Sequence, residues 1–231
     1  MMKNNTVRLL SLTLVVLMAG LLLLAGCGGN TTSGTAATTA PETTVAAEAT
    51  TAMATADSGD TGLTSDKPVK AVIDVKDYGV ITLELYPNIA PKTVENFVKL
   101  AKSGFYDGLT FHRIMNGFMI QGGDPKGNGT GGSDENIVGE FEANGFKNDL
   151  SHTRGVISMA RAQDMNSASS QFFIVHQDST FLDGQYAAFG AVTDGMNVVD
   201  KIATDAKPVD DNGTIPSDKQ PIIISITIPE E

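Results

Sequence analysis

Alternation of apolar and polar residues dominates the chain from residue 67 onward. Residues 69–75 and 80–86 alternate on either side of Asp77-Tyr78-Gly79, a pattern typical of a β-hairpin. Two short apolar runs follow on either side of Asn116-Gly117. Further strand-like runs occupy residues 155–160, 171–176, 187–192 and 222–228. The pattern therefore predicts about eight strands.

Two segments repeat their apolar residues at helical spacing instead. The first begins at Pro91, presents one apolar face and ends at Ser103-Gly104, and the second covers residues 196–203. Two helices leave little room for βαβ crossovers. We therefore predict a mostly β fold, a closed eight-stranded antiparallel β-barrel capped by two α-helices.

A glycine-rich segment follows one of the predicted strands. Gly127, Gly129 and Gly132 formally satisfy the pattern G-x-G-x-x-G. A dinucleotide-binding loop of this kind opens an apolar helix, whereas the acidic stretch SDENIVGEF follows here. We reject the dinucleotide interpretation and expect a mobile loop that borders a groove.

Composition and charge narrow the class of protein. The chain has 231 residues, of which 41% are hydrophobic, so it can bury a core and is best described as one domain with extensions. From residue 67 onward, 14 Lys and Arg stand against 22 Asp and Glu, so the predicted domain carries a formal net charge of −8. This acidic excess does not provide the basic surface that binds nucleic acid, and we expect no nucleic-acid partner.

The N-terminus has the features of an export signal. Lys3 and Arg8 precede an apolar run over residues 9–24. The run ends in Leu24-Ala25-Gly26-Cys27, which resembles the lipobox of bacterial lipoproteins, where the cysteine is lipid-modified and becomes the first mature residue. An ordinary signal peptide or an uncleaved membrane helix with an incidental cysteine is the alternative.

These segments predict the organisation of the whole chain. Residues 1–26 form a lipoprotein signal peptide, residues 27–66 a lipidated cysteine and a flexible Thr/Ala-rich tether, and residues 67–231 the folded domain. The tether contains no aromatic residue and cannot offset its own ordering entropy. We therefore expect an extracytoplasmic protein, anchored to the bacterial cell membrane through lipid at Cys27.

Six motifs stand in register along the predicted domain: FHRIMNGFMIQGGD, GNGTGG, GVISMA, SQFFI, FLDG and FGAVTDGMNVVD. Together they resemble the cyclophilin family of peptidyl-prolyl cis-trans isomerases over residues 69–228. The family's eight-stranded barrel with two capping helices agrees with the fold predicted above. The resemblance implies a monomeric isomerase whose partners are proline-containing peptides and unfolded exported proteins.

The resemblance also implies a set of site residues. Arg113 matches the catalytic arginine of the family. The positions that match its substrate groove are Phe118, Met119, Gln121, Ala160, Arg161, Gln171, Phe173, Phe181, Leu182 and Tyr186.

Three of these positions depart from the best-known eukaryotic members. Arg161, Phe181 and Tyr186 stand where those members carry asparagine, tryptophan and histidine. The family's contact at the first position is largely through the backbone, so we expect it to survive. Loss of the indole N–H is expected to weaken binding of cyclosporin-like ligands.

The chemistry of the reaction explains the need for an arginine. Rotation of an X-Pro bond crosses a barrier of about 18–20 kcal/mol because it breaks amide resonance. The twisted prolyl nitrogen regains a lone pair, so a donor aimed at it stabilises the transition state more than either ground state. The guanidinium of Arg113 is always protonated and forked. The reaction needs no nucleophile, metal or cofactor, and His112, His152 and His176 lack close ligand spacing.

Each assignment has an alternative. By spacing alone, an arginine on a strand more often faces solvent, and Phe118 and Met119 are core residues by default. A proline-peptide-binding or holdase module with little turnover is the second hypothesis, but a pure binder has no need of Arg113 and Gln121 as a donor pair. A solute-binding lipoprotein is the third, and it fails on size and on the absence of two α/β lobes.

Overall fold

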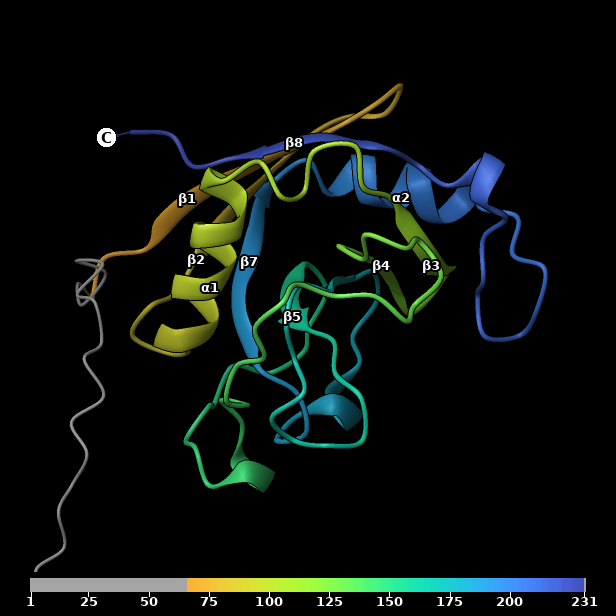
Figure 1. Cartoon of the computed structure of the whole chain (residues 1–231). Coiled ribbons are helices and arrows are strands. Elements are labelled where there is room, and N and C mark those ends of the chain that lie inside the picture. The colour runs from red at the N-terminus through yellow and green to blue at the C-terminus, as the bar shows by residue number, and fades with distance from the viewer. Residues whose placement is uncertain (1–65, 231) are drawn as a thin grey trace, which may run out of the picture. The chain divides into compact units, whose positions relative to one another are not determined.

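The computed structural model describes residues 66–230, which form one antiparallel sheet of eight strands with two helices (Figure 1). Along the sheet the strands follow the order β3-β4-β6-β5-β7-β2-β1-β8. Their bounds are β1 (Val69–Val75), β2 (Gly79–Leu85), β3 (Phe111–Met115), β4 (Met119–Gly122), β5 (Val156–Met159), β6 (Phe172–Val175), β7 (Ala188–Asp194) and β8 (Ile223–Thr227).

The two edge strands of the sheet, β3 and β8, meet through main-chain hydrogen bonds. The N–H of Gly108 donates to the carbonyl of Ile223 at 2.8 Å, and the N–H of Ile223 donates to the carbonyl of Leu109 at 2.8 Å. The N–H of Phe111 donates to the carbonyl of Pro221 at 2.9 Å. Register shifts in several strand pairs add the bending that closure requires. The sheet is thus a nearly closed barrel, as predicted.

Both predicted helices are present as α1 (Pro91–Lys102) and α2 (Met196–Asp205). Proline occupies the start of α1, where its missing N–H costs nothing, and Lys99 and Lys102 lie in the last turn, where the helix dipole favours a cation. From the apolar face of α1, the Phe97 ring packs 5.5 Å from the Phe172 ring of the core. Three 3₁₀ turns were not predicted: Glu142–Asn144, Thr180–Leu182 and Ser217–Lys219.

Strand alternation divides the apolar residues into two clusters. On β6, Phe172 is fully buried in the main core, while its neighbour Phe173 belongs to a second cluster with Met119, Val175 and Leu182. Successive side chains on a strand point to opposite faces, so the main core and the second cluster lie on either side of β6. The second cluster underlies the candidate site.

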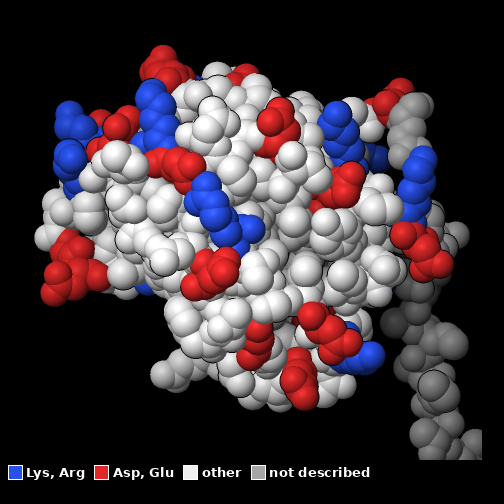
Figure 2. Space-filling model, turned by 180° about the vertical axis from the view of Figure 1, so that it is seen from behind, with Lys and Arg blue, Asp and Glu red and all other residues white. Residues whose placement is uncertain are grey.

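The expected signal peptide, Cys27 and most of the tether lie outside the described residues. Within residues 66–230, no helix has both the length and the apolar character to cross a bilayer. Basic and acidic side chains are interspersed on the face of the molecule shown in Figure 2. This face therefore has no extended basic surface of the kind that holds a nucleic-acid backbone.

Candidate functional site

A cavity of about 580 Å³ opens beside strands β3 and β4. Its walls include ten of the eleven residues that the sequence predicted for the site: Arg113, Phe118, Met119, Gln121, Ala160, Arg161, Phe173, Phe181, Leu182 and Tyr186. The eleventh, Gln171, lines an adjoining cavity of about 410 Å³. The structure therefore brings the predicted residues together.

Arg113 lies in the middle of β3, opposite Gln121 of β4. Its Nη1 donates to Oε1 of Gln121 at 3.1 Å, its Nε donates to the carbonyl of Asn212 at 2.8 Å, and its Nη2 lies 3.3 Å from the sulfur of Met115. Burial lowers the pKa of Arg113, but an arginine pKa begins so high that the guanidinium stays protonated in the neutral range. Arg113 is thus a half-buried, oriented cation within the site.

A chain of amide groups extends from this cation to the glycine-rich loop. Nε2 of Gln121 donates to Oε1 of Gln171 at 2.9 Å. Nε2 of Gln171 in turn donates to the carbonyl of Gly131 at 2.7 Å and to that of Gly129 at 3.2 Å. Gln171 orients the amide of Gln121, and the loop carbonyls orient the amide of Gln171. Three successive hydrogen bonds therefore connect Arg113 to the loop and fix its position.

The glycine-rich loop borders the groove, as predicted, and a buried carboxylate shapes it. Asp124 accepts backbone N–H groups from Lys126 at 2.7 Å, Asn128 at 3.1 Å and Gly129 at 2.6 Å. Burial alone would raise the pKa of Asp124, but these backbone bonds outweigh burial and hold it below its ordinary value. The carboxylate stays ionised and stabilises the loop, and it does not line the groove.

Beside Arg113 the groove is apolar. Met119, Phe173 and Leu182 are almost fully buried and form its floor. Phe118 and Phe181 pack against each other at its edge, with ring centroids 5.5 Å apart, although 71% of Phe181 is exposed. This arrangement suits a small apolar ring held next to a hydrogen-bond donor.

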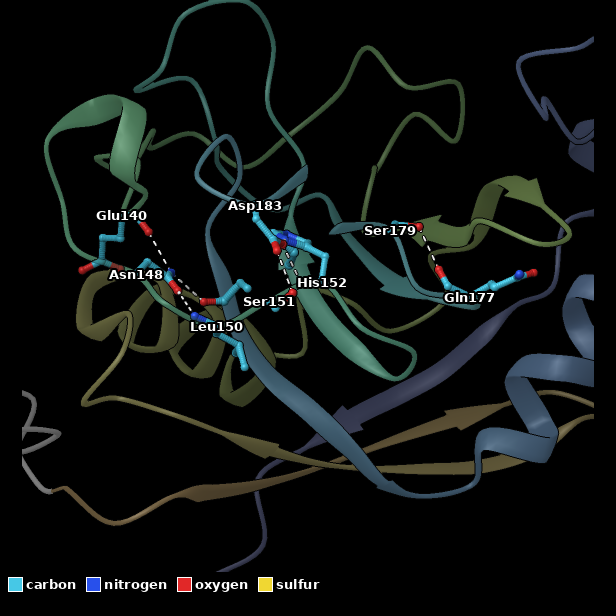
Figure 3. A network of polar contacts seen from close by, with 10 residues as sticks. Glu140, Asn148, Leu150, Ser151, His152, Gln177, Ser179 and Asp183 are labelled. Carbon is cyan, nitrogen blue, oxygen red and sulfur yellow. Dashed lines mark hydrogen bonds and ion pairs between the residues drawn. The ribbon is translucent and has the colours of Figure 1, made fainter. Parts of the chain in front are cut away.

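A polar network around His152 adjoins the apolar floor, and Figure 3 shows His152 with its neighbours Ser151 and Asp183. The ring of His152 stacks on Phe173, Nδ1 of His152 lies 2.8 Å from Oδ1 of Asp183, and Nε2 lies 3.0 Å from Oγ of Ser158. Burial lowers the pKa of His152 more than Asp183 raises it, so the neutral ring donates from Nδ1 and accepts from Ser158. Asp183 follows Leu182 directly, which ties the network to the wall of the pocket.

Ser158, His152 and Asp183 are connected as in the catalytic triad of a hydrolase, but they cannot act as one. Ser158 is fully buried and His152 is 1% exposed, so no substrate carbonyl reaches the hydroxyl. Oγ of Ser151 adds a further bond to Asp183 at 2.6 Å. The network therefore positions the pocket wall.

Several residues of the cavity were missed in the sequence. Asn212 contributes its main-chain carbonyl, which no side-chain type reveals. His112 also lines the cavity, although alternation assigns it to the face opposite Arg113. A register shift between Phe111 and Arg113 interrupts that alternation.

His112 is an unusual member of the cavity wall. Only 4% of the residue is exposed, and neither ring nitrogen has a hydrogen-bond partner among the described residues. Burial lowers the pKa of His112, with Asp124 opposing this effect and Arg113 adding to it. The ring is therefore neutral at neutral pH. No group of three or more His, Cys, Asp or Glu residues in the described part of the chain is arranged to hold a metal ion.

Known proteins resemble this chain in sequence and in fold. A family model described as "Cyclophilin type peptidyl-prolyl cis-trans isomerase/CLD" matches residues 70–228. The chain is 47% identical over 138 residues to peptidyl-prolyl cis-trans isomerase cypE of Dictyostelium discoideum, covering 58% of this chain and 86% of that protein. It is 49% identical over 122 residues to peptidyl-prolyl cis-trans isomerase B of Bacillus subtilis, covering 53% of this chain and 82% of that protein.

A solved structure is similar as well. The cyclophilin type peptidyl-prolyl cis-trans isomerase of Cryptosporidium parvum, crystallised in the presence of the dipeptide Ala-Pro, superposes with a TM-score of 0.62 at 32% sequence identity. The match covers 70% of this chain and 99% of that one.

Proposed function

This chain belongs to the cyclophilin-type peptidyl-prolyl cis-trans isomerase family, and on that premise we propose that it accelerates X-Pro isomerisation with Arg113 as its catalytic residue. One observation carries the proposal. The half-buried guanidinium of Arg113 lies beside an apolar pocket and is oriented by Gln121 and Asn212.

The pocket and the cation divide the work between them. The proline ring packs on Phe173, Met119 and Leu182, which holds the ring while the preceding carbonyl turns. The prolyl nitrogen becomes pyramidal as amide resonance is lost, and the guanidinium donates to its lone pair. Because Arg113 is already oriented by its neighbours, little reorganisation is needed when the lone pair appears.

The test is cis-trans exchange of a short X-Pro peptide, measured by NMR with the purified full chain and with Arg113→Ala. We expect Arg113→Ala to lower kcat/KM by about 10²–10³-fold, the cost of removing one preorganised donor. Circular dichroism establishes that the variant is folded. Arg113→Lys keeps the charge without the fork and is expected to recover only a small part of the activity.

Two outcomes contradict the proposal. If the folded Arg113→Ala variant turns over the peptide as fast as the unaltered chain, arginine donation is not the mechanism. If the unaltered chain binds the peptide without accelerating exchange, the groove belongs to a proline-peptide-binding or holdase module.

We also propose that the chain is a lipoprotein that acts on exported proteins outside the cytoplasmic membrane. The support is Leu24-Ala25-Gly26-Cys27 at the end of an apolar run, preceded by Lys3 and Arg8. Two or more acyl chains would anchor it stably.

Metabolic labelling with an alkyne fatty acid tests the lipid anchor. We expect label and membrane association in cells that express the full chain, and loss of both in Cys27→Ala. Equal labelling and membrane association of both proteins would mean that Cys27 is not the attachment site.

A further inference from the structure

The groove differs in charge from the domain around it. From residue 67 onward the formal net charge is −8, yet neither the 580 Å³ cavity nor the 410 Å³ cavity beside it is lined by a carboxylate. Arg113 and Arg161 are the charged residues of the two linings. Asp210 acts electrostatically on Arg113 from outside the two linings, but among the described residues no carboxylate forms an ion pair with Arg113 or Arg161, so the two cations make a local site for an anion in an otherwise acidic domain.

Arg161 stands where the two cavities adjoin, since it lines both. Its guanidinium carbon lies 5.0 Å from the ring centroid of Phe141 and 4.9 Å from that of Tyr186. Its Nε donates to the carbonyl of Gln185 at 3.1 Å, and its Nη1 donates to the carbonyl of Ala162 at 2.9 Å. These contacts hold the side chain in one geometry, so little rotamer freedom remains to be lost when a ligand binds.

One edge of this cation is open. Within residues 66–230, Nη2 of Arg161 has no hydrogen-bond partner, and Arg161 forms no ion pair. A guanidinium that is already oriented and keeps the two N–H groups of Nη2 free can donate to a carboxylate oxygen. Arg113 is less available to such a group, because its three nitrogens contact Asn212, Gln121 and Met115.

We propose that Arg161 is a specificity-determining residue that selects prolyl peptides with an acidic side chain one or two residues from the proline. An extended chain advances about 3.3–3.6 Å per residue, so neighbours of a proline seated in the first cavity reach the boundary with the second. This inference rests on the proposed isomerase function and adds a substrate class to it.

The experiment uses eight peptides of one length. Glu or Gln occupies in turn each of four positions, two before the proline and two after it. For each peptide, kcat/KM is measured by exchange NMR with the full chain. At one of these positions we expect kcat/KM for the Glu peptide to exceed that for the Gln peptide by about threefold to fivefold at low salt. This is the range expected for a partly exposed ion pair. The preference should shrink toward one at 0.5 M salt, where screening is strong.

Variants separate a local contact from net charge. In Arg161→Gln the ratio of kcat/KM for the Glu peptide to kcat/KM for the Gln peptide should fall to about one at every position. Lys70→Gln removes the same charge from β1, which lines neither cavity, and should leave the ratio at its wild-type value. Arg161→Lys should retain a smaller preference, because it keeps the charge but loses the carbonyl contacts and ring packing that orient the guanidinium.

The results that overturn the inference are distinct from those that overturn the function. If the unaltered chain turns over Glu and Gln peptides equally at all four positions, the inference is wrong while the isomerase function stands. A preference that persists in Arg161→Gln would place the anion elsewhere and would equally refute it. If no peptide is isomerised, the proposed function fails, and this inference fails with it.

Discussion

At the scale of single residues, the acceptors around Arg113 are all neutral. They are the side-chain amide of Gln121, the main-chain carbonyl of Asn212 and the sulfurs of Met115 and Met119, and no carboxylate in the described part of the chain pairs with the guanidinium. A carboxylate would orient the arginine equally well but would also compensate its charge. In the proposed mechanism, neutral acceptors leave that charge available to the prolyl nitrogen.

Substitution of Gln121 tests this orientation. Gln121→Leu keeps most of the volume and removes both the acceptor for Arg113 and the donor to Gln171. We expect kcat/KM to fall about tenfold, because a hydrogen bond to a charged group contributes about 1.5–3 kcal/mol and the rest of the site is intact. Steady-state exchange kinetics measure the change. A variant as active as the unaltered chain would show that Gln121 does not position the arginine.

The pH dependence of activity follows from the same residue. Arg113 does not titrate near neutrality, and His112, which shares the cavity, has a pKa lowered by burial. We expect kcat/KM to be nearly constant between about pH 6 and 9 and insensitive to EDTA. A steep ionisation in that range, in protein that circular dichroism shows to be folded, would refute a mechanism that rests on arginine alone.

At the scale of elements, the turn between β3 and β4 carries Phe118 to the edge of the groove, and His176 at the end of β6 holds that turn. The N–H of Gly117 donates to Nδ1 of His176 at 2.9 Å, and the N–H of His176 donates to the carbonyl of Phe118 at 2.8 Å. Nε2 of His176 lies 3.2 Å from Oδ1 of Asp200 on α2. Helix α2 therefore helps to place a wall of the substrate groove.

Two substitutions at His176 separate its two contacts. His176→Asn keeps an acceptor near the position of Nδ1, whereas His176→Gln reaches toward Asp200 and loses the acceptor for Gly117. We expect the Gln variant to raise KM for a prolyl peptide about threefold to tenfold with a smaller change in kcat, and the Asn variant to stay closer to the unaltered chain. The opposite ranking would show that the contact with Asp200 matters more than the turn.

The elements themselves could be predicted from the sequence because each has a period. The predicted strand at residues 69–75 coincides with β1, and the predicted helix at residues 196–203 ends two residues before α2 does. The 3₁₀ turn Thr180–Leu182 was missed since three residues are too few to show a period. It nevertheless brings Leu182 to the 580 Å³ cavity.

The site was less accessible to reasoning from pattern alone. Spacing marks Arg113 as an ordinary strand residue, and only its resemblance to a family motif singled it out. His112 was missed because the register shift beside it reverses the expected face, and Asn212 because its contribution is a carbonyl. Local irregularities and main-chain groups leave no trace in a pattern of apolar and polar residues.

At the scale of the whole molecule, buried ionisable groups make stability depend on pH. Burial lowers the pKa of His112 and of His152 in the folded state. Once the pH falls below about 6.5, the unfolded chain therefore binds more protons than the folded chain. Each histidine then lowers the free energy of unfolding by up to about 1.4 kcal/mol per pH unit, until that histidine is also protonated in the folded state. Asp124 and Asp183, whose pKa values are lowered, add a further loss below about pH 4.

Urea unfolding between pH 7.5 and 4.5 measures this effect. We expect the free energy of unfolding to decrease steadily below about pH 6.5, and to decrease less steeply in His152→Asn, which removes one of the two buried groups. The Asn variant will be less stable at pH 7.5, so the slopes are compared rather than the absolute values. Stability that stays constant or increases from pH 6.5 to 5 would contradict the neutral, buried state of both histidines.

The pairing of β8 with β1 on one side, and its main-chain bonds near β3 on the other, has a consequence for biogenesis. The closing strand is synthesised after the other seven strands, and its partners in β1 lie about 150 residues earlier in the chain. A nascent chain that lacks residues 221–227 has two open sheet edges and an incomplete barrel. This prolyl isomerase therefore completes its barrel only after β8 has been synthesised.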